Sequence, residues 1–126
     1  MTDKEDPSVE EQARLAEMIA IAEQNDQFRR YPDNNEARGR WVYTAAINAA
    51  GQAFLAACVE AVREYDDFTE DNDPYGTHEM GFMKVQGKTV WWKIDLFDLD
   101  YAMGSPNPAA LAETRRVLTI LFPDDY

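Results

Sequence analysis

The sequence has little of what common catalytic sites are built from: one cysteine and one histidine in 126 residues. Cys58 has no partner for an internal disulfide, and it lies on the apolar side of a helical pattern. That position predicts a buried, reduced thiol rather than a nucleophile. With His78 as the single imidazole and no serine or cysteine in a nucleophile motif, triad chemistry has no support. The glycines are scattered, which argues against a phosphate-binding loop for nucleotides.

Long apolar runs are also missing. No stretch approaches the roughly 18 apolar residues that a membrane-spanning helix needs. A signal peptide would begin with basic and then apolar residues, whereas the first twenty residues carry Asp3, Glu5, Asp6, Glu10 and Glu11. We therefore expect a soluble, cytoplasmic protein.

Positive charge is scarce, with 12 Lys and Arg residues against 24 Asp and Glu residues and a net charge of −12. Such a surface repels phosphates, so neither direct nucleic-acid binding nor attachment to an anionic membrane is expected. An acidic surface can also serve only to keep a protein dispersed. The 45% apolar and 12% aromatic content predicts a packed core. The length suits a single domain over residues 1–126, with residues 1–7 as a flexible tail.

Helical and extended patterns alternate along the first half of the chain. Ser8 followed by Glu11 predicts a helix start of the capping-box type, and Pro32 predicts its end. The β-branched and aromatic run 41–47 predicts a strand. From Asn48 onward the apolar residues recur with helical spacing as far as residue 65, and Gly51 moves the expected start of this helix towards Gln52.

A hairpin is predicted next. The two-residue loop Gln86-Gly87 would pair Met83 with Val90, Gly81 with Trp92 and Glu79 with Ile94. This alternation predicts that Trp92 and Ile94 are buried and that Lys93 stays partly exposed. In the same register His78 lies directly across from Asp95.

The last element is predicted to be a helix. Asn107 followed by Pro108 is typical of a helix start, and Pro123 would end the helix. Its buried stripe would comprise Leu111, Val117, Leu118 and Leu121. The expected element order is therefore α-β-α-β-β-α. This order predicts an α+β fold with a small, mainly antiparallel three-stranded sheet packed on helices.

Between the second helix and the hairpin lies the most distinctive segment, the acidic loop Asp66 to Gly76. Counted from Asp71, it has suitable residues at the first, third and sixth positions of a calcium-binding loop. Tyr75 and Phe82 stand where the fifth and twelfth ligands belong, so a specific calcium site is not expected.

Two other interpretations of the acids remain open. Asp71, Asp73, His78, Glu79 and Asp95 could hold magnesium or manganese and activate water, which would make the protein a metal-dependent enzyme. Their spacing is unspecific, however, and a solvated loop explains the same residues. The protein could also be an accessory subunit.

Five motifs resemble one known family. They are Asp66-Asp67-Phe68-Thr69, Asp71-Asn72-Asp73-Pro74-Tyr75-Gly76, Trp92-Lys93-Ile94-Asp95, Gly104-Ser105-Pro106 and the closing helix Thr114-Arg115-Arg116-Val117-Leu118-Thr119-Ile120. The chain resembles, from about Ile21 to Tyr126, a family of small proteobacterial proteins catalogued only as a domain of unknown function. The resemblance implies no activity.

The leading hypothesis is a non-enzymatic acidic inhibitor that mimics the charge of nucleic acid, of the anti-CRISPR or anti-restriction type, and needs no cofactor or metal. A compact protein of this length, about 36 Å across, spans a duplex segment with roughly 21 phosphates, a number that 24 carboxylates can match. The expected partner is a basic nucleic-acid-binding protein, such as a CRISPR effector or a restriction enzyme. The residues predicted to bind it are Asp66, Asp67, Glu70, Asp71, Asp73, Tyr75, Asp95, Asp98 and Asp100.

Overall fold

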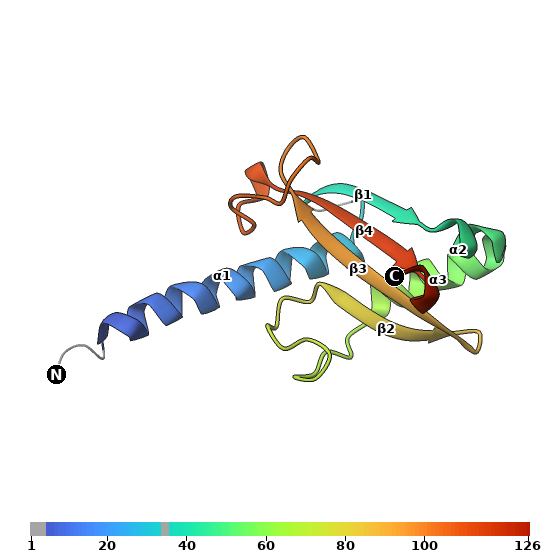
Figure 1. Cartoon of the computed structure of the whole chain (residues 1–126), viewed down its shortest axis with the longest axis horizontal. Helices are drawn as coiled ribbons and strands as arrows, with labels where there is room; N and C mark the ends of the chain where they lie inside the picture. The colour runs from blue at the N-terminus through green and yellow to red at the C-terminus, as the bar shows by residue number, and fades with distance from the viewer. Residues whose placement is uncertain (1–4, 34–35) are drawn as a thin grey trace.

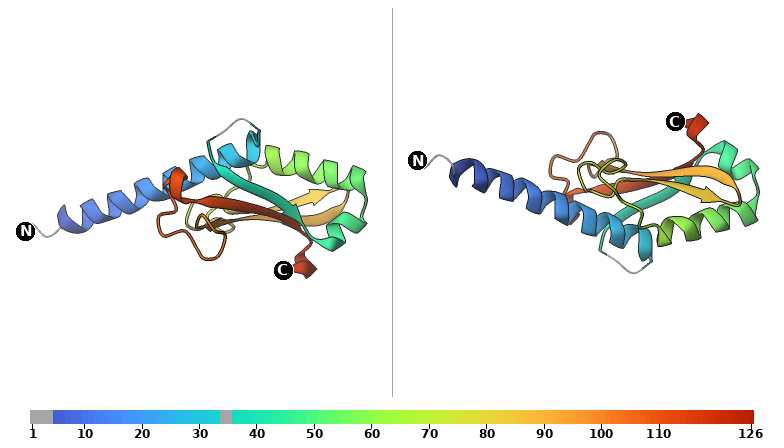
Figure 2. Two further views of the ribbon diagram at one scale, coloured as in Figure 1. Left: turned by 90° about the horizontal axis from the view of Figure 1, so that it is seen from above. Right: turned by 90° about the horizontal axis from the view of Figure 1, so that it is seen from below.

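The computed structural model describes residues 5–33 and 36–126, which form one α+β domain of two layers (Figure 1). The strands are β1 (Arg38–Tyr43), β2 (Met80–Val85), β3 (Lys88–Phe97) and β4 (Arg115–Leu121). They form a four-stranded sheet in the order β1-β4-β3-β2, and the helices cover one of its faces (Figure 2). The α+β class is confirmed. The sheet has one strand more than predicted and is mixed, because β1 runs parallel to β4 whereas the other pairs are antiparallel.

The first helix, α1 (Glu5–Arg30), has 26 residues, which corresponds to about 39 Å. It begins before the predicted cap at Ser8 and ends just before Pro32, as predicted. Of the predicted tail, residues 1–4 lie outside the described residues and residues 5–7 are the first of α1. The second half of α1 packs on the sheet, whereas its first half projects beyond the domain (Figure 1). Every side chain from residue 8 to 17 is exposed.

Strand β1 lies three residues earlier than the start predicted for it, and the chain after it turns into the short helix α2 (Ala45–Ala49). The turn is built by Thr44, whose hydroxyl accepts a hydrogen bond from the Ile47 N–H at 3.3 Å. Gly39 allows β1 to approach β4, because a Cβ there would lie 1.8 Å from the backbone oxygen of Arg116. The next helix, α3 (Gln52–Glu64), starts directly after Gly51, as predicted from the low helix propensity of glycine.

The buried face of α3 confirms the predicted pattern. Phe54, Cys58 and Val62 point into the core, and Cys58 is a free, fully buried thiol. Burial without a compensating charge raises the pKa of this thiol. Cys58 is therefore part of the packing, as predicted.

The hairpin of β2 and β3 has the predicted register, with Met83 opposite Val90 and Gly81 opposite Trp92. Gln86 and Gly87 both have positive φ, 51° and 83°, which gives the two-residue turn its right-handed fit to the strands. Trp92 and Ile94 are buried, at 0% and 3% exposure, and Lys93 is half-buried.

The register prediction fails at one point. Ile94 N–H still donates to the Glu79 carbonyl at 2.8 Å, but at His78 the backbone turns away with φ of 57°. His78 therefore does not pair with Asp95. Its imidazole instead contacts α1.

The predicted closing helix is wrong: the segment 115–121 is strand β4, in the interior of the sheet. Short 3₁₀ turns stand at its two ends, η2 (Leu111–Glu113) and η3 (Pro123–Asp125). Within β4 every second residue is buried, namely Arg116, Leu118 and Ile120, which is the period of a strand. The apolar residues from Leu111 to Leu121 also fit a helical spacing, and that spacing led to the wrong prediction. Hydrogen bonding to β1 on one side and β3 on the other outweighs local helical preference here.

Candidate functional site

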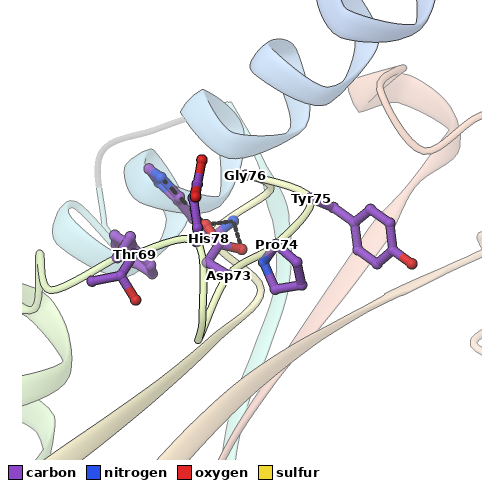
Figure 3. A pocket seen from close by; sticks show the side chains of 8 residues that line it. Thr69, Asp73, Pro74, Tyr75, Gly76 and His78 are labelled. Carbon is purple, nitrogen blue, oxygen red and sulfur yellow. Dashed lines mark hydrogen bonds and ion pairs between the residues drawn. The ribbon is translucent and has the colours of Figure 1, made fainter.

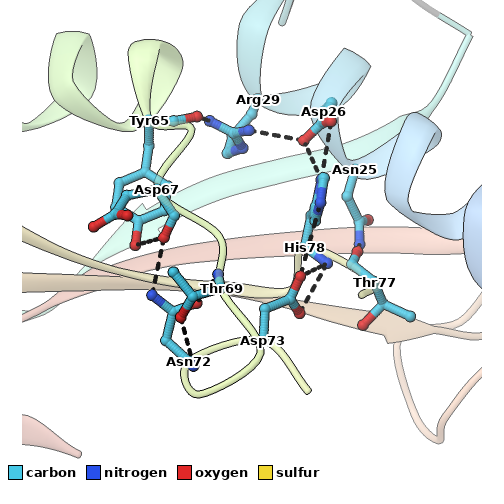
Figure 4. A network of polar contacts seen from close by, with 10 residues as sticks. All are labelled: Asn25, Asp26, Arg29, Tyr65, Asp67, Thr69, Asn72, Asp73, Thr77 and His78. Atoms are coloured by element: carbon cyan, nitrogen blue, oxygen red, sulfur yellow. Dashed lines mark hydrogen bonds and ion pairs between the residues drawn. The ribbon is translucent and has the colours of Figure 1, made fainter. Parts of the chain in front are cut away.

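The acidic loop between α3 and β2 is held in shape by its own polar side chains. Asn72 donates from Nδ2 to the Asp67 carbonyl at 2.9 Å, and its Oδ1 accepts the Thr69 N–H at 2.9 Å. In return, the Thr69 hydroxyl accepts the Asn72 N–H at 3.2 Å (Figure 4). These three bonds close the loop on itself, so its acids project from a defined backbone.

His78 fastens this loop to α1. Its Nδ1 lies 3.0 Å from Asp26 Oδ2, and its Nε2 lies 3.7 Å from Asp73 Oδ2 (Figure 4). The backbone N–H of His78 donates to the Asp73 carboxylate at 3.3 Å, and the imidazole stacks on Phe68 at a centroid distance of 3.8 Å. The imidazole is thus placed between two carboxylates, neither of which is the predicted Asp95.

The carboxylate of Asp26 has a second partner, the buried guanidinium of Arg29, at 2.7 Å. Arg29 also donates to the carbonyls of Val62 and Tyr65, at 2.6 and 2.9 Å, which closes the C-terminal end of α3. Burial lowers the pKa of Arg29, and its hydrogen bond and charge interaction with Asp26 oppose that effect. Asp26 therefore joins the acidic loop to the core through one side chain.

The polar contacts that residues 24–26 of α1 make with the rest of the chain were not predicted from the sequence. Asn25 donates to the Thr77 carbonyl at 2.8 Å and accepts from Arg116 Nε at 2.7 Å, while Arg116 Nη2 donates to Gln24 Oε1 at 3.0 Å. Burial lowers the pKa of Arg116 to about 10, a shift that the negative charge of Glu79 opposes. The polar run 24–26 within an apolar helical stripe was a signal that these residues face partners, but it could not identify them.

Four of the predicted partner-binding acids lie together on the surface of the loop. Asp66, Asp67, Glu70 and Asp71 are exposed, and none of them forms an ion pair within the described part of the chain. Asp73 differs, because its side chain is only 9% exposed and belongs to the His78 contacts. It supports the loop rather than presenting charge.

The other three predicted acids lie elsewhere. Asp95 points to the sheet face that the helices leave uncovered, and its carboxylate pairs with Lys93. Asp98 accepts the backbone N–H groups of Asp100 and Ala102 at 3.2 and 3.0 Å, and such bonds lower its pKa. Asp100 is exposed in the same turn. The structure therefore divides the predicted set between two sides of the molecule.

Of the residues of the alternative metal site, Asp73 and His78 lie together, whereas Asp71 and Asp95 lie elsewhere. His78 lies between Asp26 and Asp73, while Asp71 is exposed on the loop and Asp95 is paired on the other face. Across residues 5–33 and 36–126, no three His, Cys, Asp or Glu side chains are arranged to hold a metal ion.

Tyr75, at the tip of the loop, is 73% exposed and extends away from the other loop residues (Figure 3). One hollow of about 360 Å³ lies on the loop itself and is lined by Phe68, Thr69, Glu70, Asp73, Pro74, Tyr75, Gly76 and His78. A second, of about 490 Å³, lies between Tyr75 and α1 and is lined by Glu11, Arg14, Leu15, Met18 and Tyr75. The loop therefore follows α1 from Asp26 to Leu15, and it ends on a partly apolar surface that Glu11 and Arg14 border.

The model of a family described as "Protein of unknown function (DUF3768)" matches residues 43–125. The chain belongs to this family. The match includes α2, α3, the acidic loop and strands β2, β3 and β4, and leaves α1 outside. No curated protein and no solved structure matches the chain. In the described residues, no helix combines the length and the apolar character that crossing a membrane requires.

Proposed function

We propose that this protein is a non-enzymatic acidic binding protein that occupies the nucleic-acid site of a basic partner, as anti-CRISPR and anti-restriction inhibitors do. The observation that carries the proposal is the unpaired acidic surface of α1 and the acidic loop. The loop acids Asp66, Asp67, Glu70 and Asp71 are exposed, and α1 adds the exposed Glu10, Glu11 and Glu17, of which Glu11 lines the hollow beside Tyr75. We call this the acidic surface.

An acidic surface of this kind has a clear physical use. Carboxylates that have no cation of their own are available to the Lys and Arg side chains that line a nucleic-acid site, and they steer association with it. Such steering raises the rate of association and orients the two proteins, but it supplies little short-range packing. Tyr75 and Leu15, 73% and 56% exposed beside these acids, supply apolar contact area that can be desolvated in a complex.

The stiffness of the loop supports the same function. Its internal hydrogen bonds and the His78 contacts define where the acids lie before any partner arrives. A pre-organised surface loses less conformational entropy on binding than a flexible acidic tail does. Mimicry of a regular phosphate array needs such defined positions.

The test is charge reversal on the loop. The variant Asp67→Lys, Glu70→Lys, Asp71→Lys changes exposed side chains only, so its thermal unfolding should stay close to that of the parent. If these groups meet Arg and Lys of the partner, binding should weaken by several kcal/mol, which is on the order of a hundredfold or more. Binding is measured by pull-down and competition against nucleic-acid-binding defence complexes, with DNA as the competitor.

A matched variant controls for net charge. Glu60→Lys, Glu113→Lys, Asp124→Lys makes the same total change at exposed positions away from the loop, and it should bind nearly as the parent does. The proposal fails if the loop variant binds as tightly as the parent. It fails equally if DNA and the protein occupy such a complex together without competing.

A further inference from the structure

One face of the sheet has no α-helix packed on it. α1 and α3 lie on the other face, and α2 lies at the end of the sheet (Figure 2). On the helix-free face, the C-terminal turn η3 contacts β3, and Tyr126 lies against Trp91. The strand register and the alternation of buried residues define the side chains of this open face. They are Arg38, Arg40 and Val42 of β1, Arg115, Val117 and Thr119 of β4, Thr89, Trp91, Lys93, Asp95 and Phe97 of β3, and Met80, Phe82 and Lys84 of β2. Leu121 of β4 has the same register but is buried.

The charge of the open face is opposite to that of the molecule. Arg38, Arg40, Lys84, Lys93 and Arg115 lie on it, while Asp95 is its single acid and pairs with Lys93. Elsewhere two of the chain's 12 Lys and Arg residues, Arg29 and Arg116, are buried in the core. Five of the 12 Lys and Arg residues of a protein with net charge −12 thus lie on the strands of one face.

The same face carries aromatic rings at both of its ends. Trp91 lies between Phe82 and Tyr126, with centroid distances of 5.4 and 5.7 Å. At the other end the Arg40 guanidinium lies 4.0 Å above the ring of Tyr101. Phe82 and Tyr126 are 37% and 75% exposed, so ring surface is available to a ligand.

The arginine end also has a hollow. A space of about 330 Å³ is lined by Glu36, Arg38, Leu111, Ala112 and Arg115. The Arg115 guanidinium beside this hollow is suited to a phosphate, which a guanidinium can bind through two parallel hydrogen bonds.

We propose that the open face of the sheet binds single-stranded nucleic acid. Arg40 and Arg115 would hold phosphates at one end, and bases would stack on Trp91 and Phe82 at the other. From Arg115 to Leu121 the face is about 20 Å long, and four strands are about 14 Å across, which suits roughly two to four nucleotides. A duplex cannot present its base faces, and a carboxylate-only peptide such as polyglutamate has no rings to stack, so the aromatic residues favour a single strand.

The net charge does not exclude this ligand, because ionic strength decides which charges act. At about 0.15 M salt the Debye length is about 8 Å, so acids behind the sheet, about one 10 Å layer away, are largely screened. At about 0.01 M it is about 30 Å, and the whole charge of −12 repels the strand. Affinity should therefore rise and then fall as salt increases. The sequence predicted no direct nucleic-acid binding because that prediction used the net charge, which is a sum over all faces of the molecule.

This inference goes beyond the proposed inhibitory function and rests on different residues. The acidic surface lies on α1 and the loop, and the open face lies on the strands. Loss of one activity would leave the other to be tested in the same preparation.

The experiment uses the full chain, fluorescein-labelled oligothymidine and oligouridine, and salt from about 0.01 to 0.5 M. Anisotropy reports binding, and quenching of tryptophan fluorescence reports stacking on Trp91. Binding of either oligonucleotide, tightest at intermediate salt, supports the proposal. Trp91→Phe should remove most of the quenching with little loss of affinity. Trp91→Ala should weaken binding roughly fivefold or more.

Two charge variants complete the test. Arg40→Gln with Arg115→Gln should weaken binding and lower the slope of log K against log salt, above the optimum, by roughly 1.4 for two lost phosphate contacts. Arg14→Gln with Lys88→Gln removes the same charge elsewhere and should leave the slope unchanged. Circular dichroism melting verifies that each variant is folded.

Several results would overturn the proposal. They are no binding at any salt, equal loss in both charge variants, unchanged quenching with Trp91→Phe, or polyglutamate displacing the oligonucleotide at equal charge concentration. Sedimentation that shows a second copy covering the open face would also overturn it.

Discussion

Trp92 shows how one residue organises the core. Its indole is fully buried, and Gly81 on the neighbouring strand leaves room for it, since a Cβ there would lie 2.1 Å from the indole nitrogen. Tyr65 packs edge-on against the ring at 5.6 Å, and the Arg29 guanidinium lies 4.9 Å from its centroid. The same side chain therefore contacts a helix end, a neighbouring strand and the cation that holds Asp26.

Trp92→Ala should lower the free energy of unfolding by about 3–5 kcal/mol, because it removes a large buried side chain and leaves a cavity. In so small a domain that loss is a large part of the total stability. Urea denaturation and thermal melting measure it, and Trp91→Ala on the open face should cost clearly less. A melting temperature unchanged to within a degree would refute the assignment.

Among the elements, the turn after β3 depends most on one carboxylate. Asp98 accepts backbone N–H groups of the turn, and its own N–H donates to the Met103 carbonyl at 2.8 Å. These donors stabilise the ionised form, with the Ala102 N–H the largest cause, and so lower the pKa of Asp98 from its usual 3.8. Protonation removes this support.

The pH dependence of stability follows from that direction. Because the folded pKa lies below the unfolded one, the folded state binds fewer protons, and the stabilisation present above about pH 4 is lost as pH falls through the folded value. Asp98→Ala should therefore be less stable than the parent at neutral pH, and the difference should shrink towards pH 3. Urea titrations at both pH values measure it. A difference of equal size at both would contradict this account.

α1 is the element that has the least packing against the domain for its length. Its second half is fixed by Asn25, Asp26 and Arg29, whereas residues 8–17 are wholly exposed. Isolated helices of this length are marginal in water. The exposed Leu15 and Ile19, 56% and 57% accessible, are understandable if this half is completed by the basic partner proposed above.

For the whole molecule, charge is the dominant property. The net charge is −12, and the mutual repulsion of the excess carboxylates opposes folding. Salt screens this repulsion more than it weakens the buried contacts of Arg29, whose side chain has no exposure.

Raising sodium chloride from about 0.01 to 0.15 M should therefore raise the melting temperature, and the charge-reversed loop variant should show a smaller rise because it carries less excess negative charge. Differential scanning calorimetry gives both values. A melting temperature that falls with salt would mean that surface attractions outweigh the repulsion.

Features that depend on neighbouring residues could be derived from the sequence. The end of α1 before Pro32, the start of α3 after Gly51 and the Gln86-Gly87 turn all follow from local backbone chemistry. The turn then determined the register that buries Trp92 and Ile94. The acidic loop and the family could likewise be predicted from the sequence, since both depend on the composition and order of the residues.

What only the tertiary structure decided are the contacts between distant segments. Strand β4 forms because β1 and β3 flank it, although its residues also fit a helical spacing, and adding it makes the sheet mixed. His78 meets Asp26, 52 residues away, because the loop folds back on α1. The open face exists because strands from four parts of the chain align their alternate side chains. No local pattern specifies such pairings, since the entropy of closing long loops is recovered only when the whole sheet forms.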